Sequence, residues 1–229
     1  MKLCIALDSQ KEKNLSLAKE LKEYSNEIWL KVGFRSFIRD NKEFIEDLKS
    51  MGFNIFLDLK LYDIPNTMAD TAEEITKLDI DMFNLHASAG RRALNTVMDR
   101  LSKYKKRPLV LAVTALTSFD NEEFKEIYES DINKKAKEFA KFSFEAGVDG
   151  VVCSVFENRE IKKITNDNFL TLTPGIRPFK EEAKDQKRVA TIELAKKEKV
   201  DFIVIGRPIY QDNNPKEKVE KILKIIKGE

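Results

Sequence analysis

The sequence predicts an α/β fold, a single (β/α)8 barrel (TIM barrel) formed by residues 1–229. Eight short runs of apolar or β-branched residues recur along the chain, and nearly every run is followed by a segment with helical spacing. The runs are 3–7, 28–33, 54–59, 82–87, 109–116, 150–155, 169–174 and 202–206. Parallel strands need a crossover between them, so this alternation predicts a parallel sheet with intervening helices. Eight such units in 229 residues fit one closed barrel, and hence one domain.

Apolar residues at helical spacing justify the helices between the runs. The clearest examples are Leu15, Leu17 and Leu21 after the first run, and Ile132, Ala136, Phe139 and Ala140 after the fifth. A doubly wound open sheet would give the same alternation, but it usually carries a glycine-rich turn after its first strand. Here that turn is Asp8-Ser9-Gln10, which has no glycine. The barrel is therefore favoured.

Two connections are long. Residues 118–131, between the fifth and sixth runs, are polar and acidic, and we expect a surface excursion rather than a domain boundary. Residues 176–188 are rich in charge and contain Pro178. They predict a long loop over the barrel top, which could serve as a lid or be an ordinary connection.

Composition limits the classes of partner. The 41 basic and 39 acidic residues nearly cancel and are interspersed, so we expect neither nucleic acid nor a membrane surface as a partner. No targeting leader or membrane-spanning run is evident, which predicts a cytoplasmic protein acting on small molecules. Cys4 and Cys153 lie inside apolar runs and are expected to be buried thiols rather than disulfide partners or metal ligands.

Charged residues stand at the carboxyl ends of the otherwise apolar runs, where barrels of this kind build their active sites. Asp8 follows the first run, Lys31 lies in the second, Asp58 lies at the end of the third, and Lys60 follows it directly. Asp58 and Lys60 are two residues apart and so point to the same face of a strand. The alternative is a structural ion pair, but buried ion pairs stabilise a fold poorly, so several together favour a function. The interleaved lysines supply the positive charge that a metal would, and no metal site is expected.

Glycine and arginine follow the last two runs. They occur in Thr173-Pro174-Gly175-Ile176-Arg177 and in Ile205-Gly206-Arg207-Pro208. A glycine lets the backbone approach an oxyanion, and a guanidinium grips it with two hydrogen bonds. Either glycine alone could merely end a strand. Together, at the two positions where such barrels bind phosphate, they predict a phosphate site. The single histidine, His86, is expected to be structural rather than a general base.

Residues 58–67 read Asp-Leu-Lys-Leu-Tyr-Asp-Ile-Pro-Asn-Thr, and this segment closely resembles the signature of the orotidine 5′-phosphate decarboxylase family. The resemblance extends over nearly the whole chain. It includes residues 7–8, 31–33, 116–118, 149–154, 173–178, 185–186 and 205–208. It implies loss of CO2 from C6 of orotidine monophosphate to give uridine monophosphate, a step of de novo pyrimidine biosynthesis, without metal or cofactor.

The resemblance also implies roles for individual residues. Lys60 would be the proton donor, flanked by Asp58, while Asp8 and Lys31 would hold the ribose and complete the charged array. Asp63 and Thr67 would reach into the neighbouring subunit's site in a homodimer, and Ile64 between them would also contact substrate. The expected catalytic residues are thus Lys31, Asp58, Lys60 and Asp63.

The remaining substrate contacts come from later strands. Thr117 would hold the pyrimidine, and Gln186 would bridge the base and the phosphate. Arg177, Gly206 and Arg207 would bind the phosphate.

Two other functions stay open at this point. One is a sugar-phosphate enzyme on the same barrel, such as a hexulose-phosphate synthase or a pentulose-phosphate epimerase, which would use a metal to stabilise an enediolate. Lys60 beside Asp58 and the continuation of the motif to Thr67 argue against it. The other is a catalytically silent nucleotide-binding barrel, against which the intact charge network argues.

Overall fold

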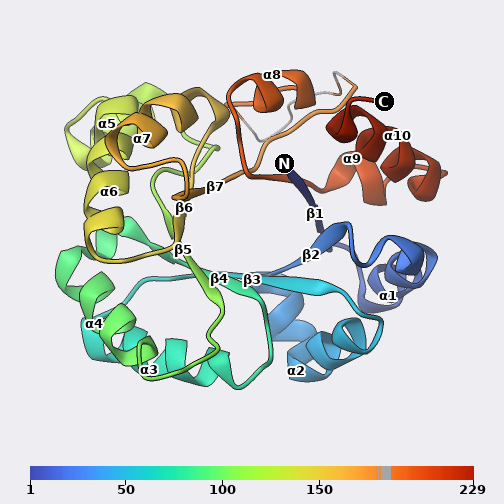
Figure 1. The fold of residues 1–229 in the computed structure, drawn as a ribbon, viewed down its shortest axis with the longest axis horizontal. Helices are drawn as coiled ribbons and strands as arrows, with labels where there is room; N and C mark the ends of the chain where they lie inside the picture. The colour runs from blue at the N-terminus through green and yellow to red at the C-terminus, as the bar shows by residue number, and fades with distance from the viewer. Residues whose placement is uncertain (180, 182–186) are drawn as a thin grey trace.

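Eight parallel strands close into a barrel in the order of the sequence in the computed structural model, which describes residues 1–179, 181 and 187–229 (Figure 1). The strands are β1 (Lys2–Ala6), β2 (Ile28–Gly33), β3 (Asn54–Leu61), β4 (Met82–His86), β5 (Leu109–Val113), β6 (Gly150–Val152), β7 (Leu170–Thr173) and β8 (Phe202–Ile205). The predicted (β/α)8 barrel is confirmed, and β8 closes it by pairing with β1.

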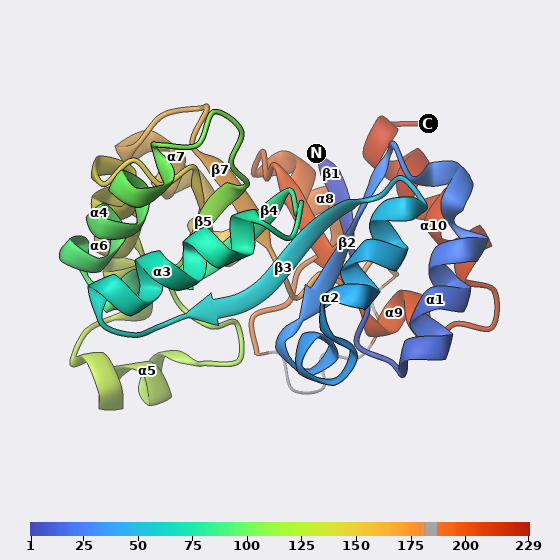
Figure 2. The same ribbon diagram turned by 90° about the horizontal axis from the view of Figure 1, so that it is seen from below.

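Helices surround the strands on all sides (Figures 1 and 2). They are α1 (Lys11–Glu20), α2 (Phe34–Ser50), α3 (Pro65–Thr76), α4 (Arg91–Leu101), α5 (Asn121–Tyr128), α6 (Ile132–Glu145), α7 (Asn158–Ile164), α8 (Ile192–Lys197), α9 (Arg207–Tyr210) and α10 (Pro215–Lys227). Short 3-10 turns lie at Lys22–Tyr24, Ala87–Ala89 and Val155–Glu157. No helix among the described residues is both long enough and apolar enough to cross a membrane.

The two-residue period of each strand divides its side chains between two cores. Leu3 and Ile5 of β1 pack outward with residues of the helices, whereas Cys4 and Ala6 belong to a separate cluster inside the barrel. Cys4 and Cys153 are both buried free thiols, as predicted. Every strand therefore has one face toward the helices and one toward the barrel axis, and polar residues on the second face enter the barrel.

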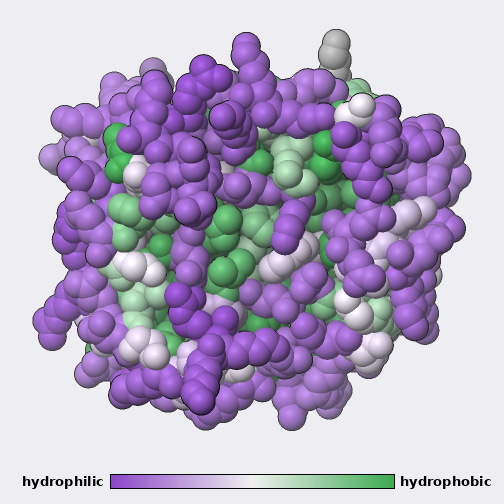
Figure 3. Space-filling model, in the orientation of Figure 1, coloured by the Kyte–Doolittle hydropathy of each residue, from purple (hydrophilic) through white to green (hydrophobic). Residues whose placement is uncertain are grey.

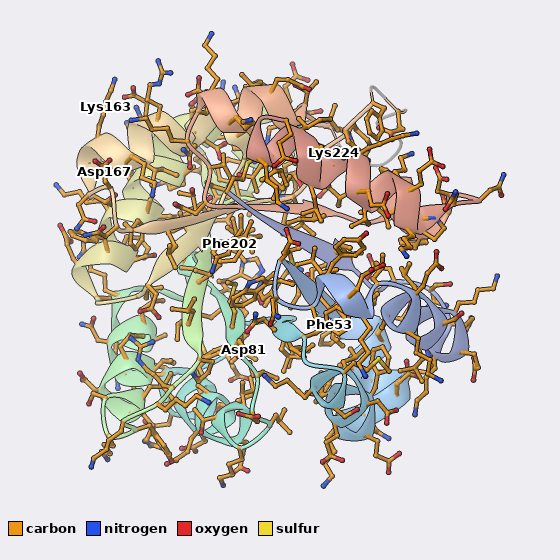
Figure 4. All side chains as sticks on the ribbon, turned by 45° about the vertical axis from the view of Figure 1, so that its right-hand side comes forward. Phe53, Asp81, Lys163, Asp167, Phe202 and Lys224 are labelled. Carbon is orange, nitrogen blue, oxygen red and sulfur yellow. The ribbon has the colours of Figure 1, made fainter. Side chains whose placement is uncertain are left out.

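Aromatic side chains fill the barrel near the amino ends of the strands. The rings of Trp29 and Phe202 meet edge to face with centroids 5.2 Å apart, and the Lys2 ammonium lies 5.5 Å from each ring. Figure 4 places Phe202 at the centre of the molecule, while Lys163 and Lys224 lie on surrounding helices. The space-filling view in Figure 3 has apolar residues at its centre and hydrophilic ones around them. This end of the barrel is packed, so room for a ligand must come from the carboxyl ends of the strands.

Six strands, β1 and β4 to β8, end earlier than their apolar runs suggest, and the clearest cases are among β5, β6 and β7. β5 ends at Val113, β6 at Val152, and β7 at Thr173. The residues that follow β5 leave the ladder and line a cavity, and those that follow β6 form the 3-10 turn 155–157. A run of apolar residues signals burial, and burial here continues past the last ladder hydrogen bond.

The segment 118–131, expected to be a surface excursion, contains helix α5. Asp120 caps this helix by accepting hydrogen bonds from the backbone N–H groups of Glu122 and Glu123, and the Glu123 carboxylate completes a capping box. Phe124 is fully buried and anchors the helix. α5 lies beyond the other helices, on the side to which the β3 arrow points (Figure 2). Of the loop 176–188, residues 180 and 182–186 lie outside the described part of the chain, so the lid interpretation stays a prediction.

Candidate active site

A cavity of about 250 Å³ lies at the carboxyl ends of the strands. Eight residues that the sequence singled out line it together: Asp8, Lys31, Asp58, Lys60, Thr117, Arg177, Gly206 and Arg207. They come from loops or strand ends of β1, β2, β3, β5, β7 and β8. The structure thus brings both halves of the predicted site, the charged array and the glycine–arginine turns, into one cavity.

The inward face of the first three strands delivers the charged array. In register, Ala6 of β1 pairs with Lys31 of β2, and Gly33 of β2 pairs with Asp58 of β3. Lys31 follows Trp29 by two residues, and Asp58 follows Phe56 by two. Each charged side chain therefore points to the same side of its strand as an inward-facing apolar residue. The same period that builds the interior core therefore aims these groups into the cavity.

The charges alternate in sign at short distances. The Lys31 Nζ lies 3.4 Å from Asp8 Oδ1 and 3.2 Å from Asp58 Oδ2, and the Lys60 Nζ lies 2.6 Å from Asp58 Oδ1. Asp58 is only 9% exposed, whereas the Asp8 side chain is about half exposed. Lys31 is thus enclosed between two carboxylates, and Asp58 between two ammonium groups.

The protonation states follow from this arrangement. Burial alone would raise the pKa of Asp58, but Lys31 and Lys60, with hydrogen bonds from Lys60 and Asn84, hold that pKa well below its ordinary value. Burial likewise opposes the charge on Lys31, yet Asp58 and Asp8 raise the pKa of its ammonium above the ordinary range. Near neutral pH, both residues are therefore fully charged.

The end of β3 departs from regular strand geometry. Lys60 has a φ of 52°, and the pairing of β3 with β4 shifts register between Leu57 and Leu61. The backbone N–H of Lys60 donates to the side-chain Oδ1 of Asn84 (2.7 Å), and the Asn84 Nδ2 donates to Asp58 Oδ1 (2.7 Å). Sequence reasoning missed Asn84 as a site residue. Its signal was present, because a polar residue two positions after Met82 must share the inward face of β4.

The opposite side of the cavity holds the predicted anion-binding groups. Gly175 has a φ of 79°, a conformation that a side chain would strain, and Arg177 is only 7% exposed. A methyl group at Gly206 would lie 3.3 Å from the Ala6 Cβ, so glycine keeps the backbone close to β1. The two turns bring Arg177 and Arg207 to one cavity together with Gly175 and Gly206, a set of groups that suits an oxyanion.

Three predicted residues, Asp63, Ile64 and Thr67, are described by the structure and do not line this cavity. Asp63 and Thr67 are exposed and line a neighbouring hollow together with Phe34 and Tyr62. The Asp63 carboxylate accepts a hydrogen bond from the backbone N–H of Ile64 (2.6 Å), and Ile64 itself is 67% exposed. Within this chain they do not face the cavity that holds Arg177 and Arg207. Gln186 lies outside the described residues.

His86 lies beside this cavity and is not among the described residues that line it. Its ring contacts that of Tyr62, with centroids 5.6 Å apart. Partial burial and the nearby Lys60 lower the pKa of His86, so the imidazole is neutral at pH 7. In the part of the chain that the structure describes, no cluster of His, Cys, Asp and Glu is suited to hold a metal ion.

Chemically, the cavity offers a fixed ammonium group beside a carboxylate, with a cationic pair of arginines across from it. A fixed ammonium can stabilise developing negative charge and then give up its proton. The closed barrel and this charged cavity together define a (β/α)8-barrel enzyme.

Comparison with known proteins identifies the family. A family model described as orotidine 5′-phosphate decarboxylase / HUMPS family matches residues 1–222. Over 228 residues the chain is 72% identical to the orotidine 5′-phosphate decarboxylase of Nautilia profundicola, with 99% of each chain covered. It is 61% identical over 228 residues to that of Campylobacter jejuni subsp. jejuni serotype O:23/36, covering 99% of this chain and 100% of the relative.

Solved structures agree with this result. The crystal structure of orotidine 5′-phosphate decarboxylase from Lactobacillus acidophilus superposes with a TM-score of 0.83 at 32% identity and covers 97% of each chain. The chain therefore belongs to the orotidine 5′-phosphate decarboxylase / HUMPS family, which confirms the resemblance carried by residues 58–67.

Proposed function

We propose that this chain decarboxylates orotidine 5′-monophosphate to uridine 5′-monophosphate and CO2 in pyrimidine biosynthesis, as a single catalytic domain of residues 1–229. Relatives that carry the decarboxylase name are 58–72% identical over nearly the full chain. The observation that carries the proposal is the ion array in which Asp58 lies between Lys31 and Lys60. Lys60 donates the proton to C6 of the pyrimidine.

The binding mode follows from the two sides of the cavity. Arg177, Gly206 and Arg207 bind the phosphate, because they place guanidinium groups and close backbone together. Asp8 and Lys31 hold the ribose at the charged end. Thr117, which also lines the cavity, contacts the pyrimidine. The proposed role of Gln186, bridging base and phosphate, is carried over from the resemblance alone.

The chemistry demands direct stabilisation of negative charge. Loss of CO2 from C6 leaves an electron pair in the ring plane that the ring cannot delocalise well. Repulsion between Asp58 and the substrate carboxylate contributes about 4 kcal/mol, if the charges are about 4 Å apart at an effective dielectric of 20. Enzymatic accelerations require roughly 8 to 23 kcal/mol. Stabilisation by the Lys60 ammonium, and binding energy from the remote phosphate, must therefore supply most of the remainder.

We further propose that two copies of the chain form a homodimer in which Asp63, Ile64 and Thr67 complete the partner's site. Ile64 and Tyr62 are 67% and 63% exposed, and Phe34 and Ile38 nearby in sequence on α2 are 60% and 64% exposed. Exposed apolar side chains around the Asp63 hollow are suited to burial against a second subunit. A cytoplasmic location likewise stays a prediction.

The decisive experiment is an absorbance assay on orotidine monophosphate with and without EDTA. We expect turnover to uridine monophosphate at the same rate in both. Turnover lost in EDTA and restored by a divalent metal would favour the metal-dependent sugar-phosphate chemistry of the rival enzymes. Tight binding of uridine monophosphate without turnover would instead indicate a silent nucleotide-binding barrel.

A further inference from the structure

Asn84 lies at the point where the two reacting side chains of β3 meet β4. It is 1% exposed, and it lines the cavity with Asp58 and Lys60. Its side-chain oxygen accepts from the backbone N–H of Lys60, and its side-chain nitrogen donates to Asp58 Oδ1, both at 2.7 Å. One amide therefore contacts the backbone of one residue and the carboxylate of the other.

The backbone of Lys60 needs this acceptor. Its φ of 52° is unusual for a residue with a side chain, and the register shift between Leu57 and Leu61 takes it out of the regular β3–β4 ladder. The N–H group is thereby directed at Asn84, and the hydrogen bond holds the backbone from which the Lys60 side chain projects. A small rotation here would move the ammonium at the end of a four-carbon chain.

The carboxylate of Asp58 also needs an uncharged hydrogen-bond donor. Its Oδ1 accepts from both the Lys60 ammonium (2.6 Å) and the Asn84 amide (2.7 Å), while Oδ2 faces Lys31 at 3.2 Å. When Lys60 gives up its proton to substrate, one of these interactions weakens. The amide remains and keeps Oδ1 in place without competing for the proton.

We propose that Asn84 is a positioning residue for the reaction, which fixes Asp58 and Lys60 as one unit through its two amide hydrogen bonds. This inference rests on the proposed decarboxylase function. Asn84 acts through its neighbours: it orients the Lys60 ammonium and the Asp58 carboxylate, and these two groups contact the substrate.

An amide is the group of this size that supplies an acceptor and a neutral donor together. Asn84→Asp keeps the shape and the acceptor but replaces the donor by negative charge next to Asp58. Protonation of the introduced carboxyl restores a donor, since a carboxylic acid has one O–H and one C=O. Burial and the adjacent Asp58 favour that protonated form. The kcat of this variant should consequently depend on pH in a way that the kcat of the parent enzyme does not.

The test compares Asn84→Ala and Asn84→Asp with a matched control, Thr171→Val. Thr171 is also a fully buried polar residue of a strand, but its hydroxyl bonds to Asp201, next to the amino end of β8 and away from the cavity. We measure kcat and KM for orotidine monophosphate, the Kd of uridine monophosphate, and the melting temperature. Each variant's kcat is then divided by the parent's kcat at the same pH, from pH 5 to 9.

We expect Asn84→Ala to lower kcat on the order of 10- to 100-fold, with little change in the Kd of uridine monophosphate, because misplacement of reacting groups costs rate rather than product affinity. Asn84→Asp should be impaired at high pH, and its relative kcat should rise as the pH falls. Thr171→Val should lower the melting temperature and leave kcat close to that of the parent.

Unchanged kcat in both Asn84 variants of an active enzyme would overturn the inference. A loss of kcat that is fully accounted for by a lower melting temperature, and so by unfolding of the variant, would overturn it too. If Asn84→Ala does not fold, the pH-dependent ratio for Asn84→Asp decides by itself. An inactive parent chain would instead reject the proposed function, and this inference with it, which separates the two failures.

Discussion

Asp58 is surrounded by three donors, Lys31, Lys60 and Asn84, and its environment illustrates how the site works at the scale of a residue. Removing a carboxylate from water is costly, so an ion in this position needs several partners to stay charged. The same partners hold it at a fixed place in the cavity. The ionised state of Asp58 is maintained by these three donors rather than by water.

The first prediction concerns Lys60. Lys60→Ala should lower kcat by on the order of 10² or more, since losing a general acid has at least that effect. The fold should persist, because the Lys60 side chain is 37% exposed and contributes little to the core. Steady-state kinetics and a thermal melt check both statements. More than about a tenth of the parent activity in the variant would be incompatible with Lys60 as the proton donor.

The second prediction is the pH dependence of kcat. A carboxyl whose folded pKa is lowered loses its charge only below its ordinary range, and an ammonium whose folded pKa is raised loses its proton only above it. Asp58 and Lys31 are such a pair, so neither titrates between about pH 5 and 9. Their contribution to folding stability is likewise constant in that window. It is lost as the pH falls through the lowered pKa of Asp58 or rises through the raised pKa of Lys31.

We therefore expect kcat to be flat from about pH 5 to 9. In contrast, kcat/KM should fall below about pH 6 as the substrate phosphate takes up a proton. His86→Asn is the control and should leave both profiles unchanged, because His86 is not among the described residues that line the cavity. A limb near pH 7 in the kcat profile would mean that another group controls the reaction.

At the scale of elements, β2, β3 and β4 supply the site from within the strand, whereas β5 and β8 supply it through residues beyond their last hydrogen bond. β5 ends at Val113 and is followed by the cavity residue Thr117, and β8 ends at Ile205 and is followed by Gly206 and Arg207. The strand fixes the position and direction of the backbone, whereas the turn that follows lies outside the hydrogen-bonded sheet. Rigid support and local freedom thus coincide at the same edge of the barrel.

The third prediction tests the turn after β8. Arg207→Ala should lower kcat/KM about 10- to 100-fold, because a charge-assisted hydrogen bond contributes about 1.5–3 kcal/mol. Added guanidinium ion should restore part of the activity by occupying the vacated space. Arg159→Ala, on the half-exposed surface of α7, is the matched control and should have no effect. If the nucleotide kinetics of Arg207→Ala are normal, the phosphate binds elsewhere.

The fourth prediction concerns packing between β6 and β7. A Cβ at Gly150 would overlap the backbone carbonyl of Leu170, so only glycine allows the two strands to approach in this register. Gly150→Ala should lower the free energy of unfolding by about 1–3 kcal/mol through overpacking. Urea denaturation measures this loss. The kcat of the folded variant should be retained because Gly150 does not line the cavity; an unchanged midpoint would mean that the strands separate easily.

At the scale of the whole molecule, three of the predicted site residues lie outside the cavity that holds Arg177 and Arg207. Asp63 and Thr67 are exposed in a neighbouring hollow, and Ile64 beside them is an exposed apolar side chain. A two-fold dimer would place the same segment of each chain against the other, which makes the two sites mutually dependent.

The fifth prediction follows from this dependence. Lys60→Ala and Asp63→Ala homodimers should each be nearly inactive, but mixing them under conditions of subunit exchange should restore activity. Each mixed dimer has one doubly altered site and one intact site. With random 1:1 exchange half of the dimers are mixed, so roughly a quarter of the parent activity should return. Each variant taken alone through the same dilution and reassociation is the control. Confirmed exchange without recovery would show that Asp63 serves its own barrel.

Much of this protein could be predicted from the sequence, because the relevant signals are local. The alternation of apolar runs and helical segments predicted the barrel, and two-residue spacing predicted that Asp58 and Lys60 share a face. The motif at residues 58–67 predicted the family. Strand periodicity and turn chemistry act over a few residues, so they can be recognised without knowledge of the rest of the chain.

Other features were decided only by the tertiary structure. The role of Asn84 depends on the register shift between β3 and β4, and α5 depends on burial of Phe124 as well as on its capping box. That Asp63 lies outside the cavity of its own chain depends on how the backbone leaves β3. Registers between neighbouring strands and the packing of distant segments are set by the closure of the whole barrel, and no local pattern in the sequence encodes them.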